Sequence, residues 1–188
     1  MKILERKWMS LMKKLSLILF SLIILLNPIS IKVKSGEVVK VISGEKTEVR
    51  VIDGDSIEIN NKKIRLFGID APELKQECLE DSILYFCGEV SKQNLENYIR
   101  GRDIHCRYTK LDRYKRILGI CGFSCFFWGD DPDCNKLSLN QYMVRSGNAV
   151  AYKRYSKKYL NDEEWAKKNK LGIWGGEFEN PEEWRKNN

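Results

Sequence analysis

Hydrophobic and polar residues alternate in short runs between residues 47 and 123, which is the pattern of half-buried β-strands. Turn-forming pairs such as Asp53-Gly54 separate these runs. Five strands are therefore predicted, at about 47–52, 56–59, 63–68, 103–108 and 116–123. Three segments that end at or near a glycine predict helices, at about 87–100, 138–146 and 157–169.

This order of elements, with one helix between the third and fourth strands, is typical of the OB-fold, a five-stranded Greek-key barrel. We predict an α+β protein, mainly β, with about three helices. No internal repeat or low-complexity linker divides residues 36–188, so one domain is expected there. Large hydrophobic residues near the C-terminus are expected to pack that segment onto the barrel: Trp165, Ile173, Trp174, Phe178 and Trp184.

The first 35 residues differ in character from the rest of the chain. Basic residues stand before an apolar run of 12 positions, Leu15–Leu26, which Asn27-Pro28 interrupts. This pattern predicts a signal peptide over residues 1–35, because a membrane span needs roughly 20 apolar residues. Residues 33–35 are the best candidate for the cleavage site, although they lack the preferred A-x-A pattern. We expect export to the periplasm or the extracellular space, with a retained membrane anchor as the alternative.

Net charge gives no support for nucleic-acid binding once the leader is set aside. Of the formal charge of +7, residues 1–35 carry +6, which leaves +1 for residues 36–188. Basic residues are nevertheless dense at 107–116 and at 153–158. These segments are compatible with a groove that follows a nucleic-acid backbone, and equally with a solvated basic surface.

Six cysteines follow the leader, an even number that predicts disulfides in an exported chain. Zinc binding is the weaker interpretation, because no C-x-x-C pair occurs and His105, expected to be structural, is the one histidine. A turn at 110–114 would place the third cysteine opposite the fourth on neighbouring strands. Local pairing is favoured because short loops close most easily. The predicted pairs are Cys78–Cys87, Cys106–Cys121 and Cys125–Cys134.

Four acidic residues and one arginine lie within 21 positions, at or near the ends of predicted strands: Asp53, Asp55, Arg65, Asp70 and Glu73. Side chains at strand ends can converge on one exposed point. The Asp-Gly pair is also compatible with a simple hairpin turn, and the spacing of the acids excludes an EF-hand loop. Grouped carboxylates suit Ca²⁺ or Mg²⁺, and an arginine beside them suits a phosphate.

Three motifs resemble those of the staphylococcal nuclease family, in the same order and with approximately the same spacing: Val51–Asp55, Arg65–Glu73 and Asp112–Arg116. The resemblance extends from about residue 47 to residue 174. It implies an OB-fold barrel with helices packed against it. It also implies a calcium-dependent endonuclease that hydrolyses phosphodiester bonds of DNA and RNA and leaves 3′-phosphate products.

The resemblance implies that Asp55 and Asp70 bind one Ca²⁺ together with the backbone carbonyl oxygen of Ala71. Asp53 would order water bound to the metal. Ala71 replaces a threonine of the family pattern, which matters little if its carbonyl oxygen is the ligand. An extra segment at 124–137 and a longer loop after Glu73 are further departures from that pattern.

The same resemblance implies that Glu73 is the general base that activates water. Arg65 and Arg116 would hold the phosphate and stabilise the transition state, because a planar guanidinium can hold two phosphate oxygens at once. Lys115 replaces a glycine of the family pattern directly before Arg116, which leaves the shape of that turn open. The residues expected to contact the substrate are Arg113, Tyr114, Tyr152 and Tyr155.

Two classes of function remain after this comparison of motifs. The first is a secreted nuclease, and the second is a non-catalytic OB-fold module that binds nucleic acid. A pure binder has no use for Glu73, an anion directed at a phosphate, so the complete set of acids and arginines favours the nuclease. The protein is expected to act as a monomer without an obligate protein partner.

Overall fold

The computed structural model describes residues 39–124 and 137–188, and its largest element is a six-stranded sheet. The strand order is β1-β8-β9-β4-β3-β2. Neighbouring strands are antiparallel except for β4 and β9, which run parallel. The strands are β1 (Lys40–Gly44), β2 (Val49–Asp53), β3 (Ser56–Ile59), β4 (Lys62–Leu66), β8 (Ile104–Leu111) and β9 (Ile117–Gly122).

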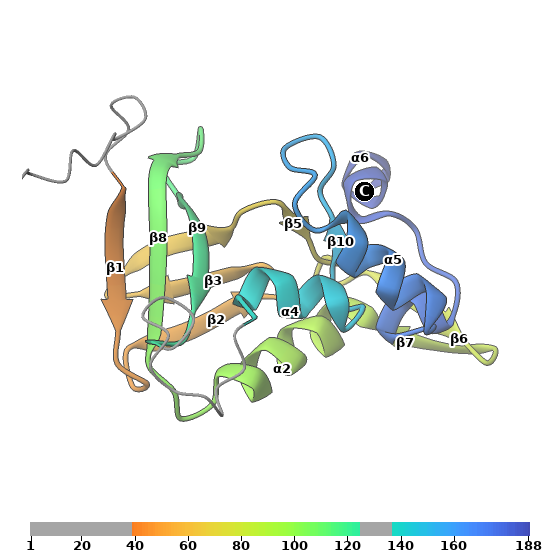
Figure 1. Ribbon diagram of the computed structural model, residues 1–188. Coiled ribbons are helices and arrows are strands. Elements are labelled where there is room, and N and C mark those ends of the chain that lie inside the picture. Colours follow the sequence, from red (N-terminus) through yellow and green to blue (C-terminus); the bar gives the residue numbers. More distant parts are fainter. Residues whose placement is uncertain (1–38, 125–136) are drawn as a thin grey trace, which may run out of the picture. The chain divides into compact units, whose positions relative to one another are not determined.

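The sheet curls because its two outer strands are consecutive in the chain. β1 and β2 stand at opposite ends of the strand order, yet only residues 45–48 separate them (Figure 1). β1 also approaches β3, because a Cβ atom added to Gly44 would lie 2.5 Å from Cγ2 of Ile59. His105 on β8 lies 2.7 Å from the hydroxyl of Ser43 on β1, which agrees with a structural role. The curled sheet and its parallel β4–β9 pair confirm the predicted OB-fold class.

Two helices pack directly on this sheet. α2 (Cys87–Ile99) lies against β2, and α4 (Leu139–Arg145) lies against β9 and against α5 (Leu160–Lys168) (Figure 1). α4 begins after Ser138, whose side-chain oxygen accepts a hydrogen bond from the N–H of Gln141 at 3.0 Å. Each fully buried aliphatic side chain contributes about 1.5–3 kcal/mol to stability. Those of the core include Ile57, Ile59, Ile64, Leu66, Leu95, Ile104, Leu139 and Met143.

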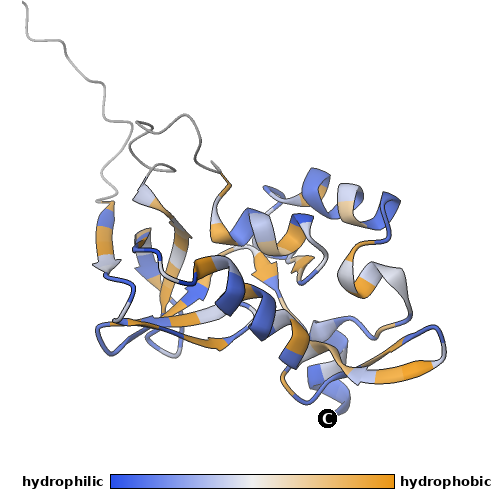
Figure 2. Ribbon diagram, turned by 90° about the horizontal axis from the view of Figure 1, so that it is seen from below, coloured by the Kyte–Doolittle hydropathy of each residue, from blue (hydrophilic) through white to orange (hydrophobic). Residues whose placement is uncertain are grey.

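Two short antiparallel strand pairs lie outside the main sheet. β5 (Ile69–Asp70) pairs with β10 (Val150–Ala151), which joins segments that are far apart in the chain. β6 (Glu77–Glu80) and β7 (Ile83–Phe86) form a hairpin that extends away from the main sheet in Figures 1 and 2. Both residues of its turn have positive φ, as the type I′ turns of tight hairpins require.

The structure contains the predicted strands and helices and adds others. The sheet has a sixth strand, β1, which the sequence pattern does not predict because most of its residues are exposed, Val41 at 53%. The β6–β7 hairpin is also absent from the prediction. A fourth helix, α6 (Pro181–Asn187), follows a short 3₁₀ turn at Gly172–Gly175 within the described residues.

The C-terminal segment packs on the β6–β7 hairpin, and in this the prediction of packing on the barrel core was wrong. Its cluster is separate from the barrel core and contains Cys78, Cys87, Val150 and Ile173, with Tyr85, Trp174 and Phe178 packed against it. Trp165 is 46% exposed, and its ring centre lies 4.4 Å from the guanidinium carbon of Arg145. A cation–π contact of this kind stabilises an indole ring at the surface. Trp184 on α6 is half-buried.

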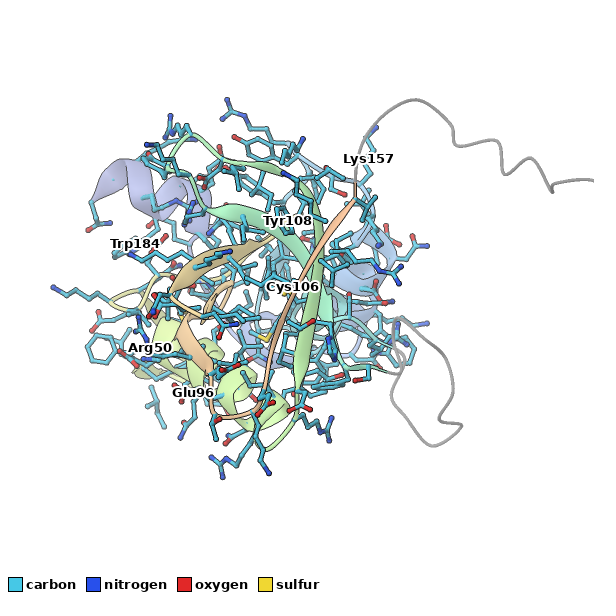
Figure 3. All side chains as sticks on the ribbon, turned by 90° about the vertical axis from the view of Figure 1, so that its left-hand side faces the viewer. Arg50, Glu96, Cys106, Tyr108, Lys157 and Trp184 are labelled. Carbon is cyan, nitrogen blue, oxygen red and sulfur yellow. A yellow bond between two sulfur atoms is a disulfide. The ribbon has the colours of Figure 1, made fainter. Side chains whose placement is uncertain are left out.

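Two of the three predicted disulfides are confirmed. Cys78 and Cys87 are bonded to each other and join β6 to the start of α2. Cys106 and Cys121 are bonded across β8 and β9, where the strand register places them opposite each other. Figure 3 looks onto these strands, with Cys106 near the middle of the view. Disulfides are typical of proteins that fold in an oxidising compartment.

Two sequence predictions lie outside the described residues. They are the signal peptide over residues 1–35 and the disulfide Cys125–Cys134, and both stay predictions. Within residues 39–124 and 137–188, no helix has the length and apolar character that crossing a bilayer requires.

Candidate active site

One turn and two strand ends bring the predicted acidic cluster together. Asp53 ends β2 and Asp55 directly precedes β3, so the β2–β3 turn presents both carboxyl groups. Arg65 lies opposite Ser56 in the antiparallel β3–β4 register, and therefore beside the aspartate before it. Asp70 ends β5, a few residues after β4. The order of strands thus gathers residues that the sequence spaces apart.

Position 54 in this turn requires a glycine, because side chains of other segments approach its backbone closely. A Cβ atom added there would lie 1.9 Å from Oγ of Ser91 and 2.7 Å from Cβ of Ala71. Ser91 is itself held in place, because its hydroxyl donates a hydrogen bond to the carbonyl oxygen of Asn148 at 2.7 Å. The Asp-Gly pair therefore forms the hairpin turn that its sequence suggests and also lets α2 pack against the acidic cluster.

The Arg65 guanidinium joins the two residues that are predicted to bind metal. Its Nη1 lies 2.5 Å from Oδ1 of Asp55, and its Nη2 lies 2.7 Å from Oδ1 of Asp70. The Arg65 side chain is 17% exposed, whereas the side chains of Asp55 and Asp70 are 5% and 0% exposed. Salt screens such buried pairs much less than it screens surface pairs. One buried guanidinium therefore brings the two carboxylates together.

The second oxygens of both carboxylates have donors too. Oδ2 of Asp55 accepts a hydrogen bond from the N–H of Ala71 at 3.0 Å, and Oδ2 of Asp70 accepts one from Nη2 of Arg185 at 2.8 Å. Asp53 lies further out, where its Oδ1 accepts a hydrogen bond from the N–H of Asp55 at 3.0 Å. Burial, and next the negative charge of Asp55, raise the pKa of Asp53 to about 7. The environment of Asp53 thus disfavours its ionised form.

Glu73 stands in a turn that other parts of the chain hold in place. Its N–H donates to Oε1 of Gln76 at 3.2 Å, and its carbonyl oxygen accepts from the N–H of Gln76 at 2.7 Å. Gln76 is fully buried and donates through Nε2 to the carbonyl oxygen of Glu179 at 2.6 Å. A Cβ atom added to Gly88 would lie 1.8 Å from the Glu73 carbonyl oxygen, so α2 also contacts this turn. The Glu73 side chain is 37% exposed, and its Oε1 accepts from Nη1 of Arg185 at 2.9 Å.

Arg185 belongs to the cluster, although the sequence analysis does not identify it. It lies on α6, which begins after Asn180, whose side chain accepts a hydrogen bond from the N–H of Glu182 at 3.0 Å. The order Asn-Pro-Glu-Glu is a recognisable helix start. Burial opposes the charged form of Arg185, but its bonds to Asp70 and Glu73 outweigh burial and raise its pKa above the ordinary value. The sequence thus signals the helix, whereas the acidic partners of its arginine come from the fold.

Arg116 lies on the same face of the sheet as Arg65. In the parallel β4–β9 register Ile64 lies opposite Ile117, and both are buried. Because side chains alternate along a strand, the adjacent residues Arg65 and Arg116 are directed to the opposite, outer face. Nε of Arg116 lies 2.7 Å from Oδ2 of Asp112. The structure thus places both predicted phosphate contacts on one face, with Arg116 held by an ion pair of its own.

The turn before Arg116 keeps the backbone conformation that a glycine favours. Lys115, which stands where the family motif has glycine, has φ of 64°, in the left-handed region. Oδ1 of Asp112 accepts hydrogen bonds from the N–H groups of Tyr114 and Arg116, both at 2.9 Å. The replacement of glycine by lysine is therefore accommodated in a turn that Asp112 organises.

The four predicted substrate contacts fall into two groups. In the β8–β9 turn, the Tyr114 side chain is 65% exposed, and the guanidinium carbon of Arg113 lies 4.7 Å from its ring centre. Tyr152 directly follows β10, the strand that pairs with the end of β5, and its ring lies 4.8 Å from that of Tyr155. Burial, and next the negative charge of Asp70, raise the pKa of Tyr152. The second group therefore lies beside the acidic cluster.

The cluster is chemically suited to a hard divalent cation. Its four carboxyl groups face two guanidinium groups, so negative charge is in excess, and Ca²⁺ prefers carboxylate and carbonyl oxygens. In the part of the chain that the structure describes, no three His, Cys, Asp or Glu side chains form a metal-binding group. A cation here would therefore rely on the carboxylates of Asp55 and Asp70 and on a backbone oxygen, as the motifs imply for Ala71.

Replacing Asp112 with asparagine is expected to lower the free energy of unfolding at pH 7 by about 2 kcal/mol, the contribution of hydrogen bonds to a charged group. Burial opposes ionisation of Asp112, but hydrogen bonds from Arg116 outweigh burial and hold its pKa below the ordinary value of 3.8. An acid with a depressed pKa stabilises the folded state above its ordinary pKa, and this stability is lost as pH falls through the depressed value.

The difference between wild type and Asp112→Asn is therefore expected to shrink below about pH 4, as measured by urea unfolding at pH 7 and pH 3. Glu58→Gln is the control, because Glu58 pairs at 3.1 Å with the exposed Arg50, and such pairs contribute about 0–1 kcal/mol. An equal destabilisation by Asp112→Asn at both pH values would contradict the ionised pair.

The chain is similar to proteins of one family over most of the described residues. The family profile described as "Staphylococcal nuclease homologue" matches residues 63–176, which is more than half of the chain. The "Succinoglycan biosynthesis protein ExoI" of Rhizobium meliloti (strain 1021) is 35% identical over 130 residues, which cover 68% of this chain and 63% of that protein. The chain thus spans less than two thirds of the rhizobial relative.

Two further relatives carry nuclease names. An "Uncharacterized endonuclease" of Escherichia coli is 34% identical over 134 residues, which cover 67% of this chain and 74% of that protein. A "Probable staphylococcal-like nuclease CAN3" of Oryza sativa subsp. japonica is 30% identical over 135 residues, which cover 70% of this chain and 30% of that protein. The family match includes the second and third motifs, from Arg65 to Arg116, whereas the first motif, Val51–Asp55, lies before residue 63, where the match begins.

Proposed function

The chain belongs to the staphylococcal nuclease family, and on that premise we propose that it is a nuclease that hydrolyses phosphodiester bonds of DNA and RNA. The observation that carries the proposal is the Arg65 bridge, in which one guanidinium holds the carboxylates of Asp55 and Asp70 together. The printed names of the relatives from Escherichia coli and rice support the same activity. We further propose, from the motifs, that the reaction requires Ca²⁺ and leaves a 3′-phosphate.

The residues that would hold Ca²⁺ are Asp55, Asp70 and the carbonyl oxygen of Ala71. When bound, the cation adds positive charge beside the phosphate and polarises it. Asp53 supports this set from outside, because its Oδ1 fixes the N–H of Asp55 at 3.0 Å.

Three side chains of the protein have further roles in the proposed reaction. Glu73 accepts a proton from the attacking water, and its carboxylate has acceptor capacity beyond the bond to Arg185. Arg65 and Arg116 donate N–H groups to phosphate oxygens, where negative charge grows in the transition state. A guanidinium carries several N–H donors, so Arg65 retains donors for a phosphate after it binds both carboxylates.

Aromatic side chains provide the proposed contacts with bases. Tyr114 and Tyr155 are 65% and 59% exposed, and Tyr152 contacts the second of these rings. Base stacking on such rings is tolerant of sequence because every base has a π-face. This tolerance supports cleavage with little sequence specificity.

The direct test is incubation of the purified protein with single-stranded DNA and, separately, RNA. Fragments are expected in Ca²⁺ and none in excess chelator. If the fragments end in a 3′-phosphate, a polymerase should extend them only after phosphatase treatment. Binding of either nucleic acid without fragments would instead favour the non-catalytic OB-fold module.

We also propose that the protein is exported. The two disulfides, Cys78–Cys87 and Cys106–Cys121, support maturation in an oxidising compartment, and the predicted leader over residues 1–35 supports the same route. The periplasm or the extracellular space is the proposed destination, with retention by an N-terminal anchor as the alternative.

A further inference from the structure

The Arg185 guanidinium links α6 to two acidic residues that have proposed roles in the reaction. Its Nη2 lies 2.8 Å from Oδ2 of Asp70, and its Nη1 lies 2.9 Å from Oε1 of Glu73. One planar fork thus holds two carboxylates at a fixed separation. Arg185 lies beyond residue 176, where the match to the family profile ends. The roles assigned from the three motifs therefore do not include it.

The start of α6 is fastened to the segment that carries Glu73. Leu79 and Glu177 exchange two backbone hydrogen bonds, at 2.9 and 2.8 Å. The fully buried Gln76 donates to the carbonyl oxygen of Glu179 at 2.6 Å, directly before the helix. These bonds hold α6 and the Glu73 turn together, so Arg185 reaches the carboxylates from a fixed position.

We infer that Arg185 is a positioning residue for Glu73, because it anchors the carboxylate of the proposed base to Asp70. The inference rests on the proposed function and extends it to the C-terminal helix. The two terminal nitrogens of Arg185 are directed at carboxylates, so its action on the reaction passes through them. A displacement of about 1 Å at a reacting group can cost roughly 100-fold in rate. The rate of the proposed reaction therefore depends on the orientation of the Glu73 carboxylate.

The test is a double-mutant cycle of Arg185→Gln and Glu73→Gln in the full chain, with single-stranded DNA and Ca²⁺. Arg185→Gln alone is expected to lower kcat roughly 10- to 100-fold with little change in KM. In the Glu73→Gln background, the same substitution is expected to change kcat by less than about twofold, because the group that it positions is absent.

Lys186→Gln is the matched control, since it removes one positive charge from the same helix. Lys186 is 66% exposed on its side chain and lies 4.0 Å from Glu182 of its own helix, so kcat should stay at the wild-type value. Equal losses of kcat from Arg185→Gln in both backgrounds would overturn the inference, because Arg185 would then act through another group or through the fold alone. A raised KM with unchanged kcat would also overturn it, since that is the signature of a substrate contact.

Urea unfolding of the wild type, the two single variants and the double variant of the cycle measures the contact between Arg185 and Glu73 without any cleavage assay. If Arg185 and Glu73 interact, the two substitutions together should shift the unfolding midpoint less than the sum of their separate shifts. Additive shifts would contradict the contact. A wild-type protein that cleaves nothing would refute the proposed function and this inference with it. An active wild type with an equally active Arg185→Gln variant would refute the inference alone.

Discussion

Replacing Asp70 with asparagine is expected to reduce the cleavage rate by about 10³-fold or more. Asp70 is a proposed Ca²⁺ ligand, and its side chain is fully buried between Arg65 and Arg185. A bound metal supplies several kcal/mol of transition-state stabilisation, and about 1.4 kcal/mol corresponds to tenfold in rate. Asparagine keeps the size and one acceptor oxygen, whereas alanine would remove one of the two carboxylate partners of both Arg65 and Arg185. Single-turnover cleavage of single-stranded DNA measures the effect.

Asp162→Asn is the matched control for this substitution. Asp162 is 6% exposed and lies 3.2 Å from Nη1 of Arg145, so it is another buried, ion-paired aspartate, on α5. Its replacement is expected to lower stability without changing the rate of the folded protein. Calorimetric titration with Ca²⁺ should show binding in wild type and none in Asp70→Asn. A wild-type rate in excess chelator would show that the reaction does not use the metal.

Replacing Arg116 with lysine is expected to slow cleavage by roughly 10²–10³-fold while the fold persists, which corresponds to about 3–4 kcal/mol. The positive charge remains, but the planar fork that can hold two phosphate oxygens is lost. The ion pair with Asp112 holds Arg116 at the start of β9, and a lysine keeps the charge that this pair needs. The measurement is kcat at saturating single-stranded DNA, together with urea unfolding to check the fold.

Arg50→Lys controls for the loss of a guanidinium elsewhere on the sheet. Arg50, labelled in Figure 3, lies on β2, is 64% exposed on its side chain and pairs with Glu58 at 3.1 Å. This variant should cleave at the wild-type rate. If Arg116→Lys did the same, Arg116 would not contact the phosphate, and its role would be limited to the ion pair with Asp112.

The grouping of the acidic residues could be predicted because short-range features dictate it. Asp53 and Asp55 flank a hairpin turn, and Arg65 and Asp70 follow within two strand lengths. The turn and the strand register restrict the positions of side chains at adjacent strand ends, and these side chains therefore converge. The Cys106–Cys121 pair was predictable for the same reason, since a single turn sets the register of β8 and β9.

Other features were not predictable because they depend on segments that are far apart in the chain. Trp165 and the tail residues were expected to pack on the barrel, yet the tail packs on the β6–β7 hairpin, which the sequence pattern does not reveal. The first strand of the sheet, β1, has mostly exposed residues and lacks a clear alternation. Exposed strands carry a weak hydrophobic signal, although their backbone pairing is as regular as that of buried ones.

The sequence by itself determined the family, the fold class and the chemical identity of the acids and arginines in the three motifs. Each of these depends on residue types at short spacing. Strand periodicity and turn geometry determine directly where such residues lie in the fold. Only the tertiary structure decided that Arg65 bridges Asp55 and Asp70, and that Arg185 joins Asp70 to Glu73. The Arg185 contacts span more than 110 positions of the chain. The packing of every intervening segment sets such contacts, and no local pattern encodes them.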